Sequence, residues 1–298
     1  MPSASSLRSS LHEDGFVVIP SILSPDDLSL LLEATLSTAS LARKGQWPHI
    51  RTLPKQFPPW SSDPSSGIWG VQHLLHPSLP AHDIFTRSYF DPVLLSTVKE
   101  ILDCSDDDLI MELYNLLVRP DAAFELRWHR DDVPAEATVE EEERVLCAER
   151  EGEERVYSHA QWNLALFEDE SLIVVPGSHR RARTKDEREA GPYETKLEGM
   201  KVVKLKAGDA VFYDNNILHR GVYNPDRERC TLHGSMSRKG FGDRRARNVL
   251  QHGIGEWVDK CDFSILGEGK QRETAEGMRR LLVEMGRGNK DVGFSQKD

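Results

Sequence analysis

Trp128-His129-Arg130-Asp131 is the stretch from which the chemistry of this chain can be inferred, together with one distant residue, His219. Side chains alternate between the two faces of a β-strand, so His129 and Asp131 would point to the same side. His219, arriving from another strand, would add a second imidazole at the same point. Two histidines and one carboxylate on one side of a cation leave coordination positions open, which is typical of non-haem Fe(II) sites that activate dioxygen.

The His-x-Asp pattern is weak evidence alone, because it often arises by chance. Its context strengthens the interpretation. Gly208-Asp209 predicts a turn, an apolar strand follows over 210–213, and His219 comes shortly after that strand.

Short apolar segments separated by turn residues predict a mainly β fold, a sandwich or barrel, with flanking helices. The expected strands are 15–20, 109–118, 160–167, 171–175, 201–205, 210–213 and 229–236.

Two helix starts are visible. Ser24-Pro25 begins the first, with Leu28, Leu31, Leu32 and Leu36 expected to face the core, and Asp91-Pro92 begins the second. The C-terminal part is polar, with one amphipathic helix candidate over 275–285.

Composition limits the partners. The net charge of -11 argues against nucleic acid, because phosphate-backbone binding needs a basic surface. The four cysteines lack C-x-x-C spacing, which indicates a reducing compartment. No secretory signal or apolar run of about 18 residues is visible, so we expect a cytoplasmic protein that does not enter membranes.

Residues 1–298 are expected to form a single domain, with a core over about 11–238 and a helical, polar extension over about 239–298. Both a monomer and a homodimer are compatible with the sequence.

A cation is expected near the metal. Oxygenases of this kind commonly use 2-oxoglutarate, whose far carboxylate suits the planar fork of an arginine. Arg229, which opens the strand after His219, is the first choice and Arg227 the alternative.

Residues 43–90 are irregular and rich in tryptophan, as expected for a functional wall or lid, or equally for surface loops anchored by tryptophans. Trp69, Gln72 and His73 are the candidates for contact with substrate. Residues 134–156 are dense in Glu and Arg and are expected to form a solvated helix or mobile insertion without a chemical role.

An ordered set of motifs resembles the phytanoyl-CoA dioxygenase (PhyH-like) family over about residues 11–238. The motifs are the strand at 15–20 with Leu23-Ser24-Pro25, His129-Arg130-Asp131, Val175-Pro176-Gly177-Ser178-His179, and His219 with Arg229.

The resemblance implies a double-stranded β-helix (jelly-roll, cupin-like) core, Fe(II), dioxygen, and 2-oxoglutarate as co-substrate. It implies that His129, Asp131 and His219 hold the iron and that Arg229 pairs with the far carboxylate of 2-oxoglutarate. It also implies that Trp162 and Asn115 line the 2-oxoglutarate pocket.

One departure is Glu168-Asp169-Glu170-Ser171, which stands where the family often has an Asn-Gly turn. The spacing from His219 to Arg229 is also slightly shorter than in the best-known member. Asp131 is retained, which argues against a halogenase.

The expected activity is oxidation of an unactivated C–H of a small metabolite or natural-product intermediate, with release of succinate and CO2. Hydroxylation is the default, while desaturation, cyclisation or endoperoxide formation would use the same oxidant. The alternatives are an acyl-CoA hydroxylase of the phytanoyl-CoA type, a non-catalytic binder that keeps the fold, and a zinc or manganese hydrolase or isomerase on the same barrel. Oxygen-dependent consumption of 2-oxoglutarate would distinguish the expected oxygenase from the zinc or manganese hydrolase or isomerase.

Overall fold

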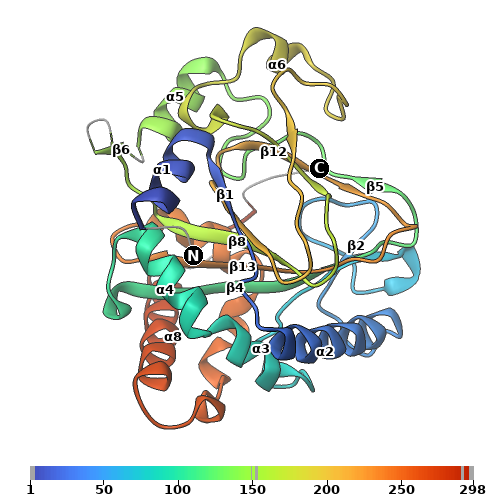
Figure 1. Ribbon diagram of the computed structural model, residues 1–298, viewed down its shortest axis with the longest axis vertical. Coiled ribbons are helices and arrows are strands. Elements are labelled where there is room, and N and C mark those ends of the chain that lie inside the picture. Colours follow the sequence, from blue (N-terminus) through green and yellow to red (C-terminus); the bar gives the residue numbers. More distant parts are fainter. Residues whose placement is uncertain (1–3, 149, 152–153, 290–291, 295–298) are drawn as a thin grey trace.

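A computed structural model describes residues 4–148, 150–151, 154–289 and 292–294. Two antiparallel sheets form its centre (Figure 1). The larger sheet has the order β1 (Phe16–Ile19), β11 (Ala210–Tyr213), β8 (His159–Ala165), β13 (Cys230–Arg238), β4 (Leu109–Val118), β3 (Ile68–Val71), β2 (Ile50–Thr52). The smaller has the order β10 (Lys201–Val202), β9 (Leu172–Val175), β12 (Leu218–Tyr223), β5 (Phe124–Glu125).

The chain alternates between the two sheets from β4 onward. It passes from β4 to β5, back to β8, across to β9 and β10, back to β11, across to β12 and back to β13. This alternation is that of a jelly roll, and it confirms the predicted double-stranded β-helix core. A separate hairpin of β6 (Arg150–Glu151) and β7 (Glu154–Arg155) lies apart from both sheets.

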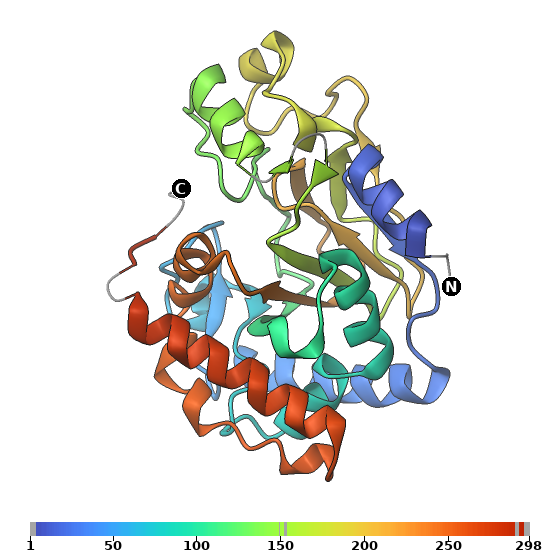
Figure 2. The ribbon, with the colours of Figure 1, turned by 90° about the vertical axis from the view of Figure 1, so that its left-hand side faces the viewer.

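Helices cover the outer face of the larger sheet (Figures 1 and 2). They are α2 (Pro25–Arg43), α3 (His82–Tyr89), α4 (Pro92–Leu102) and α8 (Lys270–Gly288), while α1 (Ala4–Asp14) precedes β1. Among the described residues, no helix is both long and apolar enough to cross a bilayer.

Both predicted helix starts are confirmed. The Ser24 hydroxyl accepts a hydrogen bond from Asp27 N, and the Asp91 carboxylate accepts one from Val93 N, so each caps its helix. Leu31 is buried as expected, whereas Leu36 is 46% exposed, so its predicted place in the core is wrong.

The structure corrects two predicted segments. Residues 43–90 are not wholly irregular, because they contain β2, β3 and α3. Residues 134–156 contain α5 (Val139–Cys147), whose Glu142 side chain is fully buried rather than solvated. Residues 149 and 152–153 of that segment lie outside the described ranges.

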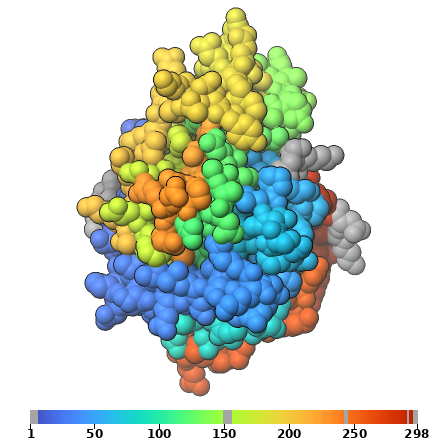
Figure 3. Space-filling model, turned by 90° about the vertical axis from the view of Figure 1, so that its right-hand side faces the viewer, coloured from blue at the N-terminus to red at the C-terminus, as the bar shows by residue number. Residues whose placement is uncertain are grey.

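The segments around the interior of the barrel come from distant parts of the sequence. Figure 3 shows light-blue residues of the segment that follows β2 beside green residues near β5 and orange residues near the end of β12. β12 also pairs directly with β5. Early, middle and late parts of the chain therefore share one face of the molecule.

Candidate active site

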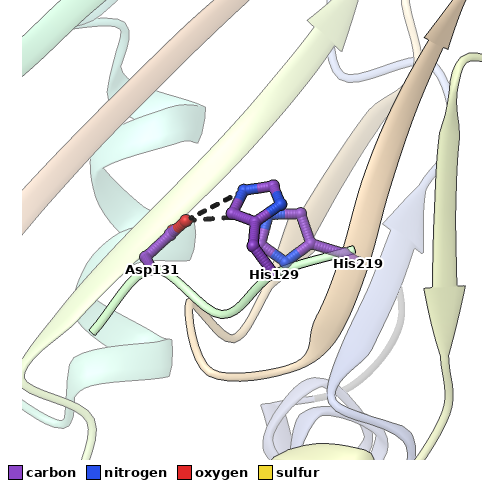
Figure 4. Close-up of side chains that lie close together, drawn as sticks. All are labelled: His129, Asp131 and His219. Carbon is purple, nitrogen blue, oxygen red and sulfur yellow. Dashed lines mark ion pairs between the residues drawn. The ribbon is translucent and has the colours of Figure 1, made fainter. Parts of the chain in front are cut away.

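The side chains of His129, Asp131 and His219 meet inside the barrel (Figure 4). Asp131 Oδ1 lies 3.6 Å from His129 Nε2 and 3.7 Å from His219 Nε2. One potential ligand atom from each residue lies within 4.8 Å of the others. These are the distances at which one cation can be shared by two imidazoles and a carboxylate.

The segment 128–131 is a loop joined to β12 by a single bridge, not the regular strand that the sequence predicts. The bridge pairs His129 with His219, and Asp131 N then donates to Asn215 O at 2.9 Å. These backbone contacts bring His129 and Asp131 to the same side, so the predicted convergence occurs by a different local structure.

Backbone carbonyls determine which imidazole nitrogens face the cluster. His129 Nδ1 lies 2.8 Å from Arg127 O, and His219 Nδ1 lies 2.8 Å from Ile217 O. Because a carbonyl oxygen can only accept, it favours the tautomer of the neutral ring with the proton on Nδ1 and the lone pair on Nε2. The two rings thus present the tautomer that a divalent metal binds.

The electrostatics of the cluster also suit a cation. Burial, and then the neighbouring His219, hold the pKa of His129 well below its usual value, so its ring stays neutral. Burial raises the pKa of Asp131, so a positive charge beside it would stabilise its ionised form. Gln161 Nε2 donates to Asp131 Oδ2 at 3.1 Å and leaves Oδ1 directed at the histidines.

Arg229 lies in the wall of the cavity onto which the cluster opens. Its Nε donates to Asp169 Oδ2 at 3.1 Å, and its guanidinium carbon lies 4.3 Å from the ring centroid of Tyr223. Its Nη1 is buried and has no hydrogen-bond partner among the described residues. Arg227, by contrast, is half-exposed and pairs with Glu170 at 3.2 Å on the surface.

The cavity has a volume of about 180 Å³. Its wall combines apolar and polar side chains from both sheets and from the C-terminal part of the chain. The lining residues include Arg51, Phe57, Trp60, Trp69, Leu113, Leu117, Gln161, Asn163, Tyr223, Arg229, Arg245, Asn248, Gln251 and His252.

Trp162 does not line this cavity, contrary to the expectation from the resemblance. It is completely buried in the main hydrophobic core, among residues such as Tyr89 and Phe212. Side chains alternate along β8, so its neighbours Gln161 and Asn163 face the cavity instead.

The other expected pocket residues divide into two groups. Trp69 is in the wall. Asn115 lies behind the wall, where its Oδ1 accepts from His73 N at 3.2 Å. Gln72 Oε1 lies 3.2 Å from His252 Nδ1, and His73 Nε2 lies 2.7 Å from His252 O. Gln72 and His73 therefore hold a lining residue in place rather than line the cavity themselves.

Residues that follow β13 also reach the cavity, which the sequence alone does not predict. Helix α7 (Gly242–Leu250) brings Arg245 and Asn248, three positions apart on one helical face, into the wall, and Gln251 and His252 follow. Arg245 is fixed by two hydrogen bonds to Glu112, at 3.0 and 2.7 Å. In the sequence, the i, i+3 spacing of Arg245 and Asn248 indicates only that they share one face of a helix. It does not indicate that this face reaches the cavity.

Arg130, between the two predicted ligands, turns away from them and is buried. Its guanidinium donates to the backbone oxygens of Ser178, at 3.0 Å, and Asn216. Next to it the buried Glu142 carboxylate accepts from Arg183 Nε at 2.6 Å and from Arg188. The segment 134–156 therefore supplies the central anion of a buried ion cluster behind the ligand loop.

Comparisons with known proteins agree with this architecture. The family model for phytanoyl-CoA dioxygenase (PhyH) matches residues 11–225. A search of curated protein sequences gives no significant match.

Three solved structures illustrate the likeness of this chain to known folds. AviO1 from Streptomyces viridochromogenes Tue57 is 18% identical, with 80% of this chain and 97% of that one covered and a TM-score of 0.55. EctD from S. alaskensis with 2-oxoglutarate and 5-hydroxyectoine is 19% identical, with 80% and 76% covered and a TM-score of 0.55. HygX from Streptomyces hygroscopicus with nickel and 2-oxoglutarate is 15% identical, with 79% and 87% covered and a TM-score of 0.55. At these identities the likeness shows a shared fold.

Proposed function

Because the chain belongs to the phytanoyl-CoA dioxygenase (PhyH) family of non-haem iron, 2-oxoglutarate-dependent oxygenases, we propose that it oxidises an unactivated C–H of a small metabolite or natural-product intermediate. Hydroxylation is the default outcome, coupled to conversion of 2-oxoglutarate into succinate and CO2. The observation that carries the proposal is the placement of the His129, Asp131 and His219 cluster on the same cavity as Arg229, whose Nη1 has no hydrogen-bond partner among the described residues.

The donor set of the cluster fits ferrous iron. His129 and His219 would bind it through Nε2 and Asp131 through Oδ1, so that all three ligands lie on one side of the metal. When bound, iron and 2-oxoglutarate supply the oxidising chemistry, in which dioxygen gives one atom to succinate and the other oxidises the substrate. The chain contributes the ligand geometry, and Gln161 keeps Asp131 oriented by its hydrogen bond to Oδ2.

Arg229 would bind the far carboxylate of 2-oxoglutarate. Its Nη1 is free for that carboxylate, while Asp169 and Tyr223 hold the rest of the guanidinium in place. Arg227 faces Glu170 on the surface and is the weaker candidate.

The size and lining of the cavity support a small substrate. Apolar side chains such as Phe57, Leu113 and Leu117 would exclude water around the reacting carbon, and Trp69 would contact substrate directly. EctD was crystallised with 5-hydroxyectoine, a molecule of the size class proposed here.

We also propose that residues 1–298 act as a single cytoplasmic domain. The C-terminal extension supports this proposal, because α7 contributes to the cavity wall and residues of α8 pack into the main core. Residues 1–3, 290–291 and 295–298 of this range lie outside the described part of the chain.

Succinate release under air, measured by mass spectrometry in a metabolite screen with Fe(II) and 2-oxoglutarate, tests the proposal. H129A and D131A should abolish substrate-dependent succinate release, because each removes one iron ligand. D83A, which removes an exposed carboxylate on α3, is the matched control and should retain it. Turnover that persists unchanged in H129A or D131A would refute the assignment.

A further inference from the structure

Arg51, on β2, is a second buried cation in the same cavity. The residue is 8% exposed and lines the cavity, with its Nε fully buried. Among the residues that the structure describes, its guanidinium has neither a carboxylate partner nor a hydrogen-bond acceptor. A buried charge is costly unless it is paired, so this guanidinium requires an explanation.

Among the described residues, the direct contacts of Arg51 are aromatic faces, and Tyr223, Tyr213 and Asp131 act on its charge without accepting a hydrogen bond from it. Its guanidinium carbon lies 5.1 Å from the ring centroid of Trp60 and 5.1 Å from that of Trp69. Such cation–π contacts offset part of the cost of burying the charge, but they leave the N–H donors unused. Burial lowers the pKa of Arg51 to about 10, so it stays protonated at neutral pH.

The other two arginines of the cavity wall are paired. Arg229 holds Asp169, and Arg245 holds Glu112 through two hydrogen bonds. Among the described lining arginines only Arg51 lacks an ion pair. The carboxylate that attracts it across the cavity, Asp131, is a proposed metal ligand, so the N–H donors of Arg51 are available to a bound molecule.

We infer that Arg51 binds a carboxylate of the organic substrate through the N–H donors that the chain leaves unused. The inference rests on the proposed function and narrows the substrate class to small organic acids. 2-Oxoglutarate does not need this arginine, because one of its carboxylates goes to the metal and the other to Arg229. His252, whose ring stacks on Trp60 at 5.9 Å, closes the same corner of the cavity.

An acyl-CoA substrate fits Arg51 poorly. The thioester end of such a molecule is neutral, and its phosphates are separated from the acyl group by the long pantetheine arm. It would therefore bring no anion to a buried guanidinium beside the metal cluster.

Binding of two probes of equal shape and different charge tests the inference. Phenylacetate and its neutral isostere phenylacetamide are titrated calorimetrically into the full-length protein, kept anaerobic with Fe(II) and saturating 2-oxoglutarate. The wild type should bind the acid about 10- to 100-fold more tightly than the amide, the range expected for a charge-assisted hydrogen bond. R51Q should bind both equally, R51K should keep part of the preference, and R87Q, which removes an exposed cation on α3, should behave as wild type.

The affinity for 2-oxoglutarate is measured in parallel from the visible absorption of the anaerobic iron complex. It should be unchanged in R51Q. The inference is overturned if the wild type shows no preference for the acid, including no binding of either probe, or if R51Q loses 2-oxoglutarate affinity instead. Failure of the wild type to bind 2-oxoglutarate would refute the proposed function, which is a different result.

Discussion

His129 and His219 exchange both of their backbone hydrogen bonds, each N to O distance being 3.0 Å, and their rings lie 4.2 Å apart between centroids. The bridge joins two distant segments of the chain at the point where two predicted ligands leave the backbone. The ligand geometry is therefore set by main-chain pairing, before any metal binds.

A preformed site should bind a divalent metal and be stabilised by it. Mn(II) at about 100 times its dissociation constant should raise the free energy of unfolding by about 2.7 kcal/mol, because it binds only the folded chain. D131A should lose this increase, since it removes the only charged ligand. Anaerobic thermal melts with and without Mn(II) measure the effect, and an equal rise in D131A would argue against the site.

Replacing Arg229 should weaken 2-oxoglutarate binding. R229Q removes the guanidinium whose Nη1 is unsatisfied in the cavity, and the affinity should fall about 10- to 100-fold. R227Q removes only an exposed ion pair with Glu170 and should have no effect. Titration of 2-oxoglutarate into both anaerobic iron-loaded variants decides between the two arginines; a larger loss in R227Q would reverse the assignment.

Glu142 should be essential for stability although it lies in a segment of exposed acids. E142Q removes the buried carboxylate that pairs with Arg183, Arg188 and Arg130. The buried Arg130 charge then loses that ion pair, at a cost of about 3–5 kcal/mol. E143Q, the adjacent exposed position on α5, should change stability by less than about 0.5 kcal/mol. Denaturant unfolding of both variants measures the difference, and equal stabilities would show that the cluster contributes little.

Local patterns predicted much of this fold. The caps at Ser24 and Asp91 gave two helices because a capping side chain, a proline and an apolar face coincide within a few residues. The strand 109–118 was predicted in full, since its apolar run is long enough to cross the core. In the site, the candidates His129, Asp131 and His219 meet, although a loop and a backbone bridge bring them together and not the strand alternation that was the basis of the prediction.

The rest depends on tertiary contacts that no local pattern encodes. Glu142 has the same neighbours in sequence as exposed acids, and only the fold brings arginines to it. Arg51 was not singled out, because its isolation is a property of the cavity. Trp162 was assigned to the wrong face of β8, because the resemblance located the strand but not its register.

Acid should weaken the Asp169–Arg229 pair. Burial alone would raise the pKa of Asp169, but the charge of Arg229 and hydrogen bonds from Ser171 and Thr231 outweigh it and lower the pKa to about 2. Because the folded pKa is below the unfolded value of 3.8, the pair stabilises the protein above about pH 4, and this contribution is lost as the pH falls towards 2. It amounts to about 2 kcal/mol.

Urea unfolding of the wild type and D169N between about pH 5 and 2 measures this contribution. The stability of the wild type should fall more steeply over that interval, since only the wild type carries the titrating carboxylate. Parallel curves would show that Asp169 is not ionised through this pair.

Gly234 provides a test of where Trp162 lies. A Cβ at Gly234 would come within 2.3 Å of Trp162 Cζ2, on the core side of the larger sheet. G234A should therefore destabilise the protein by about 1–3 kcal/mol through overpacking. G255A, whose Cβ would meet only Leu250 Cδ2 at 3.8 Å, should not. Because Trp162 faces away from the cavity, folded G234A should bind 2-oxoglutarate as the wild type does. Lost 2-oxoglutarate affinity at unchanged stability would instead place Trp162 at the co-substrate.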